Sequence, residues 1–260
     1  MTRRLLPVFF AAFGLASCGA TTGGDLVSFE AAFAGPQGVR DHAMSFTTGR
    51  GLEVRLTKAT LVVGAVYMNR TAPIAVAQEK RCISRGTYVG EVTGGAHIDL
   101  LSGVAQRGKN AGVGTTERAV TGEVWLTGGD VDAVDDPTTV AEVEGEVTLG
   151  GTPRPFRGSV SFGANRRAPA VDPARPSAAP PCRERIVSPI PIDVTPSAGG
   201  LLTVRIDPRG WFAVVPFDDL ADVGGVLTFD DANTNASSIG LAIGVRTPRG
   251  VTTFEWSPNP

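Results

Sequence analysis

Oxygen-bearing side chains stand close together near the carboxyl end of the chain, in a segment that holds Asp230, Asp231, Asn233 and Asn235. Spacing at alternate positions is what a curled loop needs if it is to direct several oxygens at one calcium ion. The segment lacks both the glycine that allows the sharp turn of an EF-hand loop and the glutamate that completes its coordination. A connection between two strands, built from Asx turns, accounts for the same residues. These side chains are therefore calcium candidates, with a purely structural turn as the alternative.

A second acidic segment follows a Gly-Gly pair and contains Asp130, Asp132, Asp135 and Asp136. Carboxylates of this density bind calcium when several of them converge on one ion. The alternative is an exposed loop in which each carboxylate is solvated separately. The segment is a second calcium candidate, with less regular spacing than the first.

Soft-metal chemistry would need histidine, cysteine or methionine in a cluster, and the chain has only two histidines and three methionines. His42 and Met44 would share one face of an extended segment, and Met68 is the remaining candidate ligand for a copper(I) site. An exposed histidine beside a core methionine explains the pattern more simply. We therefore expect no soft metal.

Nucleophilic catalysis has little support in the residue types. His97 and Asp99 would share one face of a strand with Ser102 nearby, but a base and its orienting acid normally come from separate loops. The sequence contains neither the Gly-x-Ser-x-Gly elbow of hydrolases nor a phosphate-binding Gly-x-x-x-x-Gly-Lys loop. We expect a protein without enzymatic activity, nucleotide or other cofactor.

The amino terminus has the form of an export signal. Arg3 and Arg4 precede an apolar stretch, Leu5–Leu15, that is too short to span a bilayer. The sequence Leu-Ala-Ser-Cys that ends at Cys18 resembles the lipobox of bacterial lipoproteins. The resemblance implies that residues 1–17 are removed, that Cys18 receives diacylglycerol and a fatty acid such as palmitate, and that residues 18–25 form a tether. Because Gly19 rather than aspartate follows the cysteine, the resemblance implies the outer membrane.

Two cysteines remain once Cys18 is assigned to lipid. In an oxidising compartment Cys82 and Cys182 are expected to form a disulfide. Closing a loop of about 100 residues would stabilise the fold by roughly 4 to 5 kcal/mol on the chain-entropy estimate. The alternative is two buried free thiols.

The composition favours strands over helices. Charged residues make up only 19% of the chain and hydrophobic residues 42%, while 33 glycines and 19 prolines supply turns and restrict helices. The formal net charge of -2 gives no electrostatic reason to expect a nucleic-acid partner. We predict an all-β fold, an antiparallel β-sandwich that is immunoglobulin-like or related and has little helix.

Local patterns predict strands in two halves, residues 26–166 and 182–260, joined by a proline- and alanine-rich crossover over residues 167–181. We expect the halves to pack as one unit. In the first half the predicted strands are Leu52–Thr57, Ala59–Tyr67, Val120–Leu126, Ala141–Leu149 and Phe156–Phe162. The apolar run Ala59–Tyr67 is expected to be buried on both faces, with Gly64 as a bulge or close approach. The sequence Gly-Gly-Thr-Pro at 150–153 is expected to be the hairpin connection between the last two strands. In the second half the predicted strands are Pro191–Val194, Leu201–Ile206, Trp211–Val215, Val226–Phe229, Ile239–Val245 and Val251–Trp256. A helical turn is predicted only at Asp218–Val223.

The segments 182–191 and 200–212 resemble stretches of uncharacterised bacterial surface lipoproteins, a resemblance that implies no activity. Within them, Trp211 and Phe212 are expected to pack in the core or at its border rather than to form a binding platform. The expected function is that of a membrane-anchored, non-enzymatic lipoprotein of the cell envelope. It would act as a binding or structural module for an envelope protein or a glycan. The alternative is a calcium-dependent module, which could bind carbohydrate through the two acidic segments.

Overall fold

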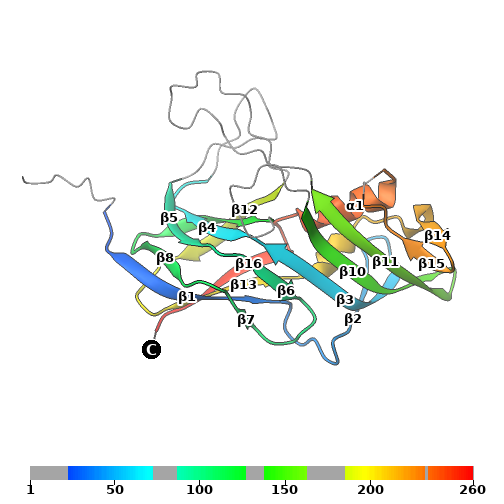
Figure 1. The fold of residues 1–260 in the computed structure, drawn as a ribbon, viewed down its shortest axis with the longest axis horizontal. Helices are drawn as coiled ribbons and strands as arrows, with labels where there is room; N and C mark the ends of the chain where they lie inside the picture. The colour runs from blue at the N-terminus through cyan, green and yellow to red at the C-terminus, as the bar shows by residue number, and fades with distance from the viewer. Residues whose placement is uncertain (1–22, 73–86, 127–137, 163–184, 232–233, 260) are drawn as a thin grey trace, which may run out of the picture.

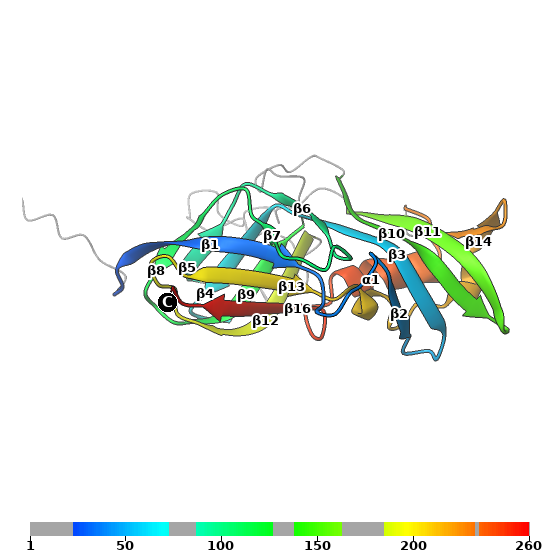
Figure 2. The same ribbon diagram turned by 90° about the horizontal axis from the view of Figure 1, so that it is seen from below.

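The computed structural model describes residues 23–72, 87–126, 138–162, 185–231 and 234–259. Strands predominate and are arranged in two sheets, which lie end to end in an elongated body (Figures 1 and 2). The predicted all-β, sandwich-like fold with little helix is confirmed. Most ladders are antiparallel, but two are parallel, between β1 and β13 and between β11 and β15.

The first sheet curls so far that its two border strands come close to each other. Its order is β12 (Ile186–Val194), β9 (Ala119–Trp125), β4 (Ala65–Asn69), β5 (Tyr88–Val92), β8 (Gly112–Thr115), β1 (Leu26–Ala34), β13 (Leu201–Ile206) and β16 (Thr252–Ser257), with the short β7 (Gln106–Arg107) on β1. The inner face of this curl is lined by buried apolar side chains.

Aromatic rings inside the curl lie over glycines of neighbouring strands. The ring of Phe254 occupies the space that a Cβ atom on Gly122 would need, and such an atom would lie 2.6 Å from the ring carbon Cδ2. Phe29 lies over Gly112 in the same way. A few large rings therefore fill part of the interior of the curl. Glycines on the facing strands leave room for them.

The second sheet is more open. Its order is β14 (Ala221–Val223), β15 (Val226–Thr228), β11 (Thr152–Phe162), β10 (Thr138–Leu149), β3 (Glu53–Val63) and β2 (Met44–Thr47), with β6 (Ala96–Asp99) also on β3. Gly150 and Gly151 form the predicted hairpin turn between β10 and β11. Both have positive φ angles, 57° and 82°, as a type I′ turn requires.

One continuous segment passes from the second sheet into the first. The strand β3 ends at Val63, and β4 begins at Ala65 in the other sheet. Gly64, which was predicted to be a bulge or a close approach, is the residue at which the chain passes from one sheet to the other. Burial on both faces was expected from Ala59 onward. It begins only at Val63, because the earlier residues of β3 still face solvent on one side of the second sheet.

Two predicted strands are helical instead. Ile239–Val245 belongs to the helix α1 (Ala236–Val245), whose first turn is capped by the side chain of Asn235. A short apolar run is equally consistent with a buried strand and a buried helix, and here the cap and the packing decide for the helix. Gly244 of α1 lets the helix lie against the 3-10 helix η2 (Pro208–Phe212).

The predicted strand Trp211–Val215 also begins in η2, because Asp207 caps that turn and Pro208 stands at its first position, where proline is favoured. The predicted core positions of Trp211 and Phe212 are confirmed, since both side chains are fully buried. The helical turn expected at Asp218–Val223 is shorter and earlier. It is η3 (Phe217–Asp219), and β14 follows it.

Helix α1, η2 and η3 lie against the inner face of the second sheet (Figure 2). There Phe156 of β11 contacts the rings of Phe212, Phe217 and Phe229 with centroid distances between 5.2 and 6.0 Å. The same hydrophobic core continues into the curl of the first sheet. The outer face of the second sheet is exposed to solvent, and the candidate site lies on that face.

Candidate binding surface

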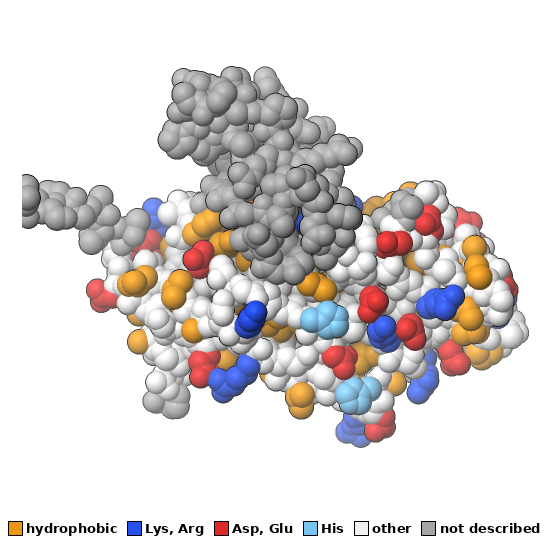
Figure 3. Space-filling model, viewed as in Figure 1, with side chains coloured by type: hydrophobic (Ala, Val, Ile, Leu, Met, Phe, Trp, Pro, Cys, Tyr) orange, Lys and Arg blue, Asp and Glu red, His pale blue; other side chains and the backbone are white. Residues whose placement is uncertain are grey.

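A groove of about 480 Å³ lies on the outer face of the second sheet, near the ends of β2, β3 and the β10–β11 hairpin. Its polar walls come from three strands and are formed by Ser45, Thr47, Glu53, Arg55, Glu146 and Thr148. Figure 3 shows acidic and basic side chains interspersed over this part of the molecule. Phe46, Val54 and Pro153 also line the groove, so it suits a ligand that has charged groups as well as some apolar surface.

The register of the ladders fixes which side chains are neighbours in the groove. Ser45 lies opposite Arg55, and Arg55 lies opposite Glu146 on its other side. Thr47 lies opposite Glu53. Small hydroxyl side chains thus stand at the border of the sheet, and the charged side chains stand one strand further in.

The charges of the groove differ from those around it. Next to it, Lys58 of β3 contacts Glu142 at 3.2 Å and Glu144 at 3.4 Å, and the hydrogen bond with Glu142 is the main cause that raises the pKa of Lys58. In the described part of the chain, the guanidinium of Arg55 takes part in no ion pair, and neither do the carboxylates in the groove. Those groups are free to interact with a ligand.

The calcium candidates near α1 direct their oxygens to different partners. Asp230 accepts hydrogen bonds from the backbone N–H, at 3.0 Å, and the hydroxyl of Thr234 in its own turn. Asp231 instead accepts from the hydroxyls of Ser159 at 3.1 Å and Ser161 at 2.8 Å on β11. Asn235 accepts from the N–H of Ser238 at 2.8 Å as the cap of α1.

These contacts give each described candidate side chain a role within the fold. Among the described residues, no three histidine, cysteine or acidic side chains form a group that could hold a metal ion. The other residues singled out from the sequence lie outside the described residues: Cys18, Cys82, Asp130, Asp132, Asp135, Asp136, Cys182 and Asn233. The predictions made for them stay predictions.

The structure pairs Asp99 with His42 rather than with His97. Nδ1 of His42 lies 3.5 Å from Oδ2 of Asp99, although both side chains are largely exposed. The other oxygen of Asp99 accepts from the N–H of Leu101 at 2.8 Å. His42 has a φ of 49° in the tight turn that precedes β2, so this contact connects the start of β2 to the end of β6. Met68 is fully buried inside the first sheet.

An aromatic cluster on the first sheet was not expected from the sequence. Tyr67 stacks on Tyr88 with a centroid distance of 4.6 Å and meets Trp125 edge-on at 5.3 Å. The indole N–H of Trp125 donates to the carboxylate of the fully buried Glu123 at 3.1 Å. Glycosylation in the folded state is excluded at Asn69, the start of an Asn-x-Thr pattern, because its side chain is fully buried.

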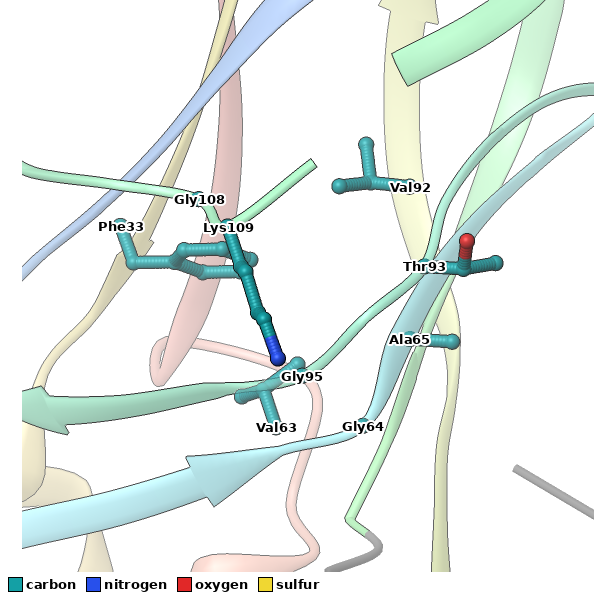
Figure 4. A pocket seen from close by; sticks show the side chains of 9 residues that line it. All are labelled: Phe33, Val63, Gly64, Ala65, Val92, Thr93, Gly95, Gly108 and Lys109. Atoms are coloured by element: carbon teal, nitrogen blue, oxygen red, sulfur yellow. The ribbon is translucent and has the colours of Figure 1, made fainter. Parts of the chain in front are cut away.

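A small hollow lies where β3 passes into β4. Figure 4 shows the side chain of Lys109 extending toward Gly95, among lining residues that include Gly64 and Phe33. Its volume is about 10 Å³, which is at the lower limit of what one water molecule needs. The hollow is therefore too small for a substrate.

No protein-family model, curated protein or solved structure matches the chain. No helix in the described part of the chain has the length and hydropathy that spanning a lipid bilayer requires. The case for function therefore rests on the export signal predicted from the sequence and on the surfaces of this fold.

Sequence reasoning missed the groove because its residues are far apart in the chain. Ser45, Arg55 and Glu146 become neighbours only through the pairing of β2, β3 and β10. The alternation in Leu52–Thr57 did place Arg55 on a solvent-facing side of a strand. It could not show which residues of other strands would lie beside it.

Proposed function

We propose that the protein is an exported lipoprotein, anchored through Cys18 in the membrane of a bacterial envelope, and that its β body is a non-enzymatic binding module. The leader and the cysteine that ends it support the anchor. The first strand begins at Leu26, eight residues after Cys18, so the tether would span at most about 28 Å. We assign the outer membrane on the identity of Gly19.

The observation that carries the binding role is the position of the groove relative to the anchor. The start of β1 lies at one end of the elongated body, whereas β2 and the β10–β11 hairpin lie at the other (Figures 1 and 2). A chain anchored by its amino terminus would therefore hold the groove away from the membrane. Arg55 and Glu146 form no ion pair among the described residues, which makes this surface suitable for an envelope protein or a glycan.

Membrane fractionation and lipid labelling test the anchor. We expect the wild-type protein to incorporate a palmitate analogue and to sediment with membranes. Cys18→Ala should lose the label and appear in the soluble fraction, whereas Gly19→Ala, which keeps the cysteine, should retain the label. Membrane retention of Cys18→Ala without label would refute the lipid anchor.

A further inference from the structure

The strand β2 forms one border of the second sheet and pairs with β3 on one side only (Figure 2). The N–H of Thr48 donates to the carbonyl of Leu52 at 2.8 Å, so this pair belongs to the hydrogen-bonded class. Because the two classes of pair alternate along an antiparallel ladder, Phe46 also bonds to β3. The residues between them, Ser45 and Thr47, must direct their N–H and C=O groups away from β3.

These four backbone groups are available for binding. Among the described residues, none of them has a hydrogen-bond partner, and both residues are exposed. An incoming strand could therefore form four hydrogen bonds with β2, two through the N–H groups of Ser45 and Thr47 and two through their carbonyls.

Three other border strands carry features that hinder pairing. In β12, Pro189 and Pro191 have no N–H to donate. The strand β16 lies close to β12, because the first sheet curls until its two border strands meet, and this leaves little room for a further strand. At the far border of the second sheet, β14 has only three residues, and Arg154 binds the side chain of Asp222 within it. The strand β2 contains no proline, lysine or bulge.

Side chains around the edge of β2 specify what kind of strand would fit. Ser45 and Thr47 are small and face the groove, so side chains opposite them could reach Arg55 and Glu53. An acidic residue opposite Ser45 and a basic residue opposite Thr47 would be complementary in charge. On the other face, Phe46 is half-buried against the core, which favours apolar neighbours there.

We propose that the edge of β2 binds an extended peptide segment of a partner protein as an additional antiparallel strand of the second sheet. The segment alternates apolar residues with charged ones, and its charged side chains enter the groove. The inference rests on the proposed role of the body as a binding module and names the class of partner.

A synthetic peptide tests the inference on the purified protein without its leader. The probe is Leu-Arg-Val-Glu-Leu-Thr, which is the sequence of residues 52–57 with its acidic and basic residues exchanged, so that Glu meets Ser45 and Arg meets Thr47. The control is the same peptide N-methylated at Arg and Glu, which cannot donate to β2. We expect binding of the probe with a Kd below about 1 mM, and at least about tenfold weaker binding of the control.

Variants of β2 locate the bound strand. Ser45→Pro removes an outward N–H without removing a bond to β3 and should weaken binding at least about tenfold, whereas Ser45→Ala keeps the N–H and should bind like the wild type. Amide exchange at Thr47 should slow when the probe binds. Absence of probe binding, or equal binding by Ser45→Pro and Ser45→Ala, would overturn the inference.

Two further outcomes are distinguishable. If the protein alone forms dimers that Ser45→Pro dissociates, the occupant of the edge is a second copy of this chain, and the proposed partner segment is wrong. The result for Cys18→Ala does not affect this experiment, because the purified protein has no anchor. Failure of the lipid anchor and failure of the strand edge are therefore separate results.

Discussion

Replacing Gly244 with alanine should weaken the packing of α1 against η2. A Cβ atom at this position would lie 2.6 Å from Cα and 2.7 Å from the carbonyl carbon of Trp211. Both are backbone atoms, which cannot rotate away as the end of a side chain could. Restoring ordinary carbon contacts would require the helix or η2 to move by about 1 Å.

Gly240 provides a matched control in the same helix. Its added Cβ would lie 3.5 Å from the nearest atom, Cα of Val215, which is ordinary contact. Both substitutions gain the same helix propensity, about 1 kcal/mol. Overpacking at Gly244 should cost about 3 kcal/mol, the upper end of the usual range, because the crowded atoms are backbone. We therefore expect Gly244→Ala to lose about 2 kcal/mol and Gly240→Ala to gain up to about 1 kcal/mol.

Urea and thermal unfolding of the purified protein, followed by tryptophan fluorescence, measure this difference. For a chain of this size a free-energy difference of 3 kcal/mol corresponds to melting temperatures about 6 to 12 °C apart. Equal stability of the two alanine variants would refute the close approach of α1 and η2. Equal destabilisation of both would show that α1 tolerates no alanine for a reason other than this contact.

Four further predictions concern the cap of α1, the ion pair between Arg118 and Asp193, the disulfide between Cys82 and Cys182, and calcium binding. Asn235→Ala should reduce the unfolding free energy by about 1 kcal/mol, because α1 loses its capping oxygen, and Asn235→Asp should restore most of it in urea unfolding. The pKa of Asp193 should lie below its ordinary value in an NMR titration, because Arg118 donates hydrogen bonds to it, and Arg118→Ala should abolish that depression. Any stability from this exposed pair would be present above the ordinary aspartate pKa and lost as the pH falls. Cys82 and Cys182 should react with thiol reagents only after reduction; immediate labelling of both would contradict the disulfide. Millimolar calcium should raise the melting temperature of the wild type no more than that of Asp231→Asn, since Asp231 already binds Ser159 and Ser161 within the fold, and a rise confined to the wild type would contradict that reasoning.

Period-two patterns located most strands because they depend on neighbouring residues only. Leu201–Ile206 is a strand with the predicted bounds, and the Gly150-Gly151 turn joins β10 to β11 as predicted. Large apolar residues alternate in α1 as they would in a strand, yet Ile239 and Ile243 are exposed in the structure and Leu241 between them is buried. Its helical state depends on Asn235 and on contacts with η2, which lies earlier in the chain.

The acidic segment near α1 shows why local spacing could not establish a metal site. Sequence proximity suggested that Asp230 and Asp231 would turn to one centre. In the structure Asp231 reaches two serines that precede it by 72 and 70 residues, whereas Asp230 binds within its own turn. Whether a carboxylate binds within its own turn or to a distant strand depends on which strand passes beside it. The sequence of the acidic segment does not show which strand that is.

Some glycines of this chain make room for aromatic rings rather than forming turns, and composition alone could not show this. Turns account for positions with positive φ such as Gly150, but Gly112, Gly122 and Gly158 stand inside strands. At each of these three the Cβ position is occupied by a phenylalanine from another segment. Glycine within a strand ordinarily weakens it, so its presence here reflects the room that a large ring needs between closely spaced strands. The aromatic residues and the strand glycines therefore form matched pairs, and replacing either member should disturb the same contact.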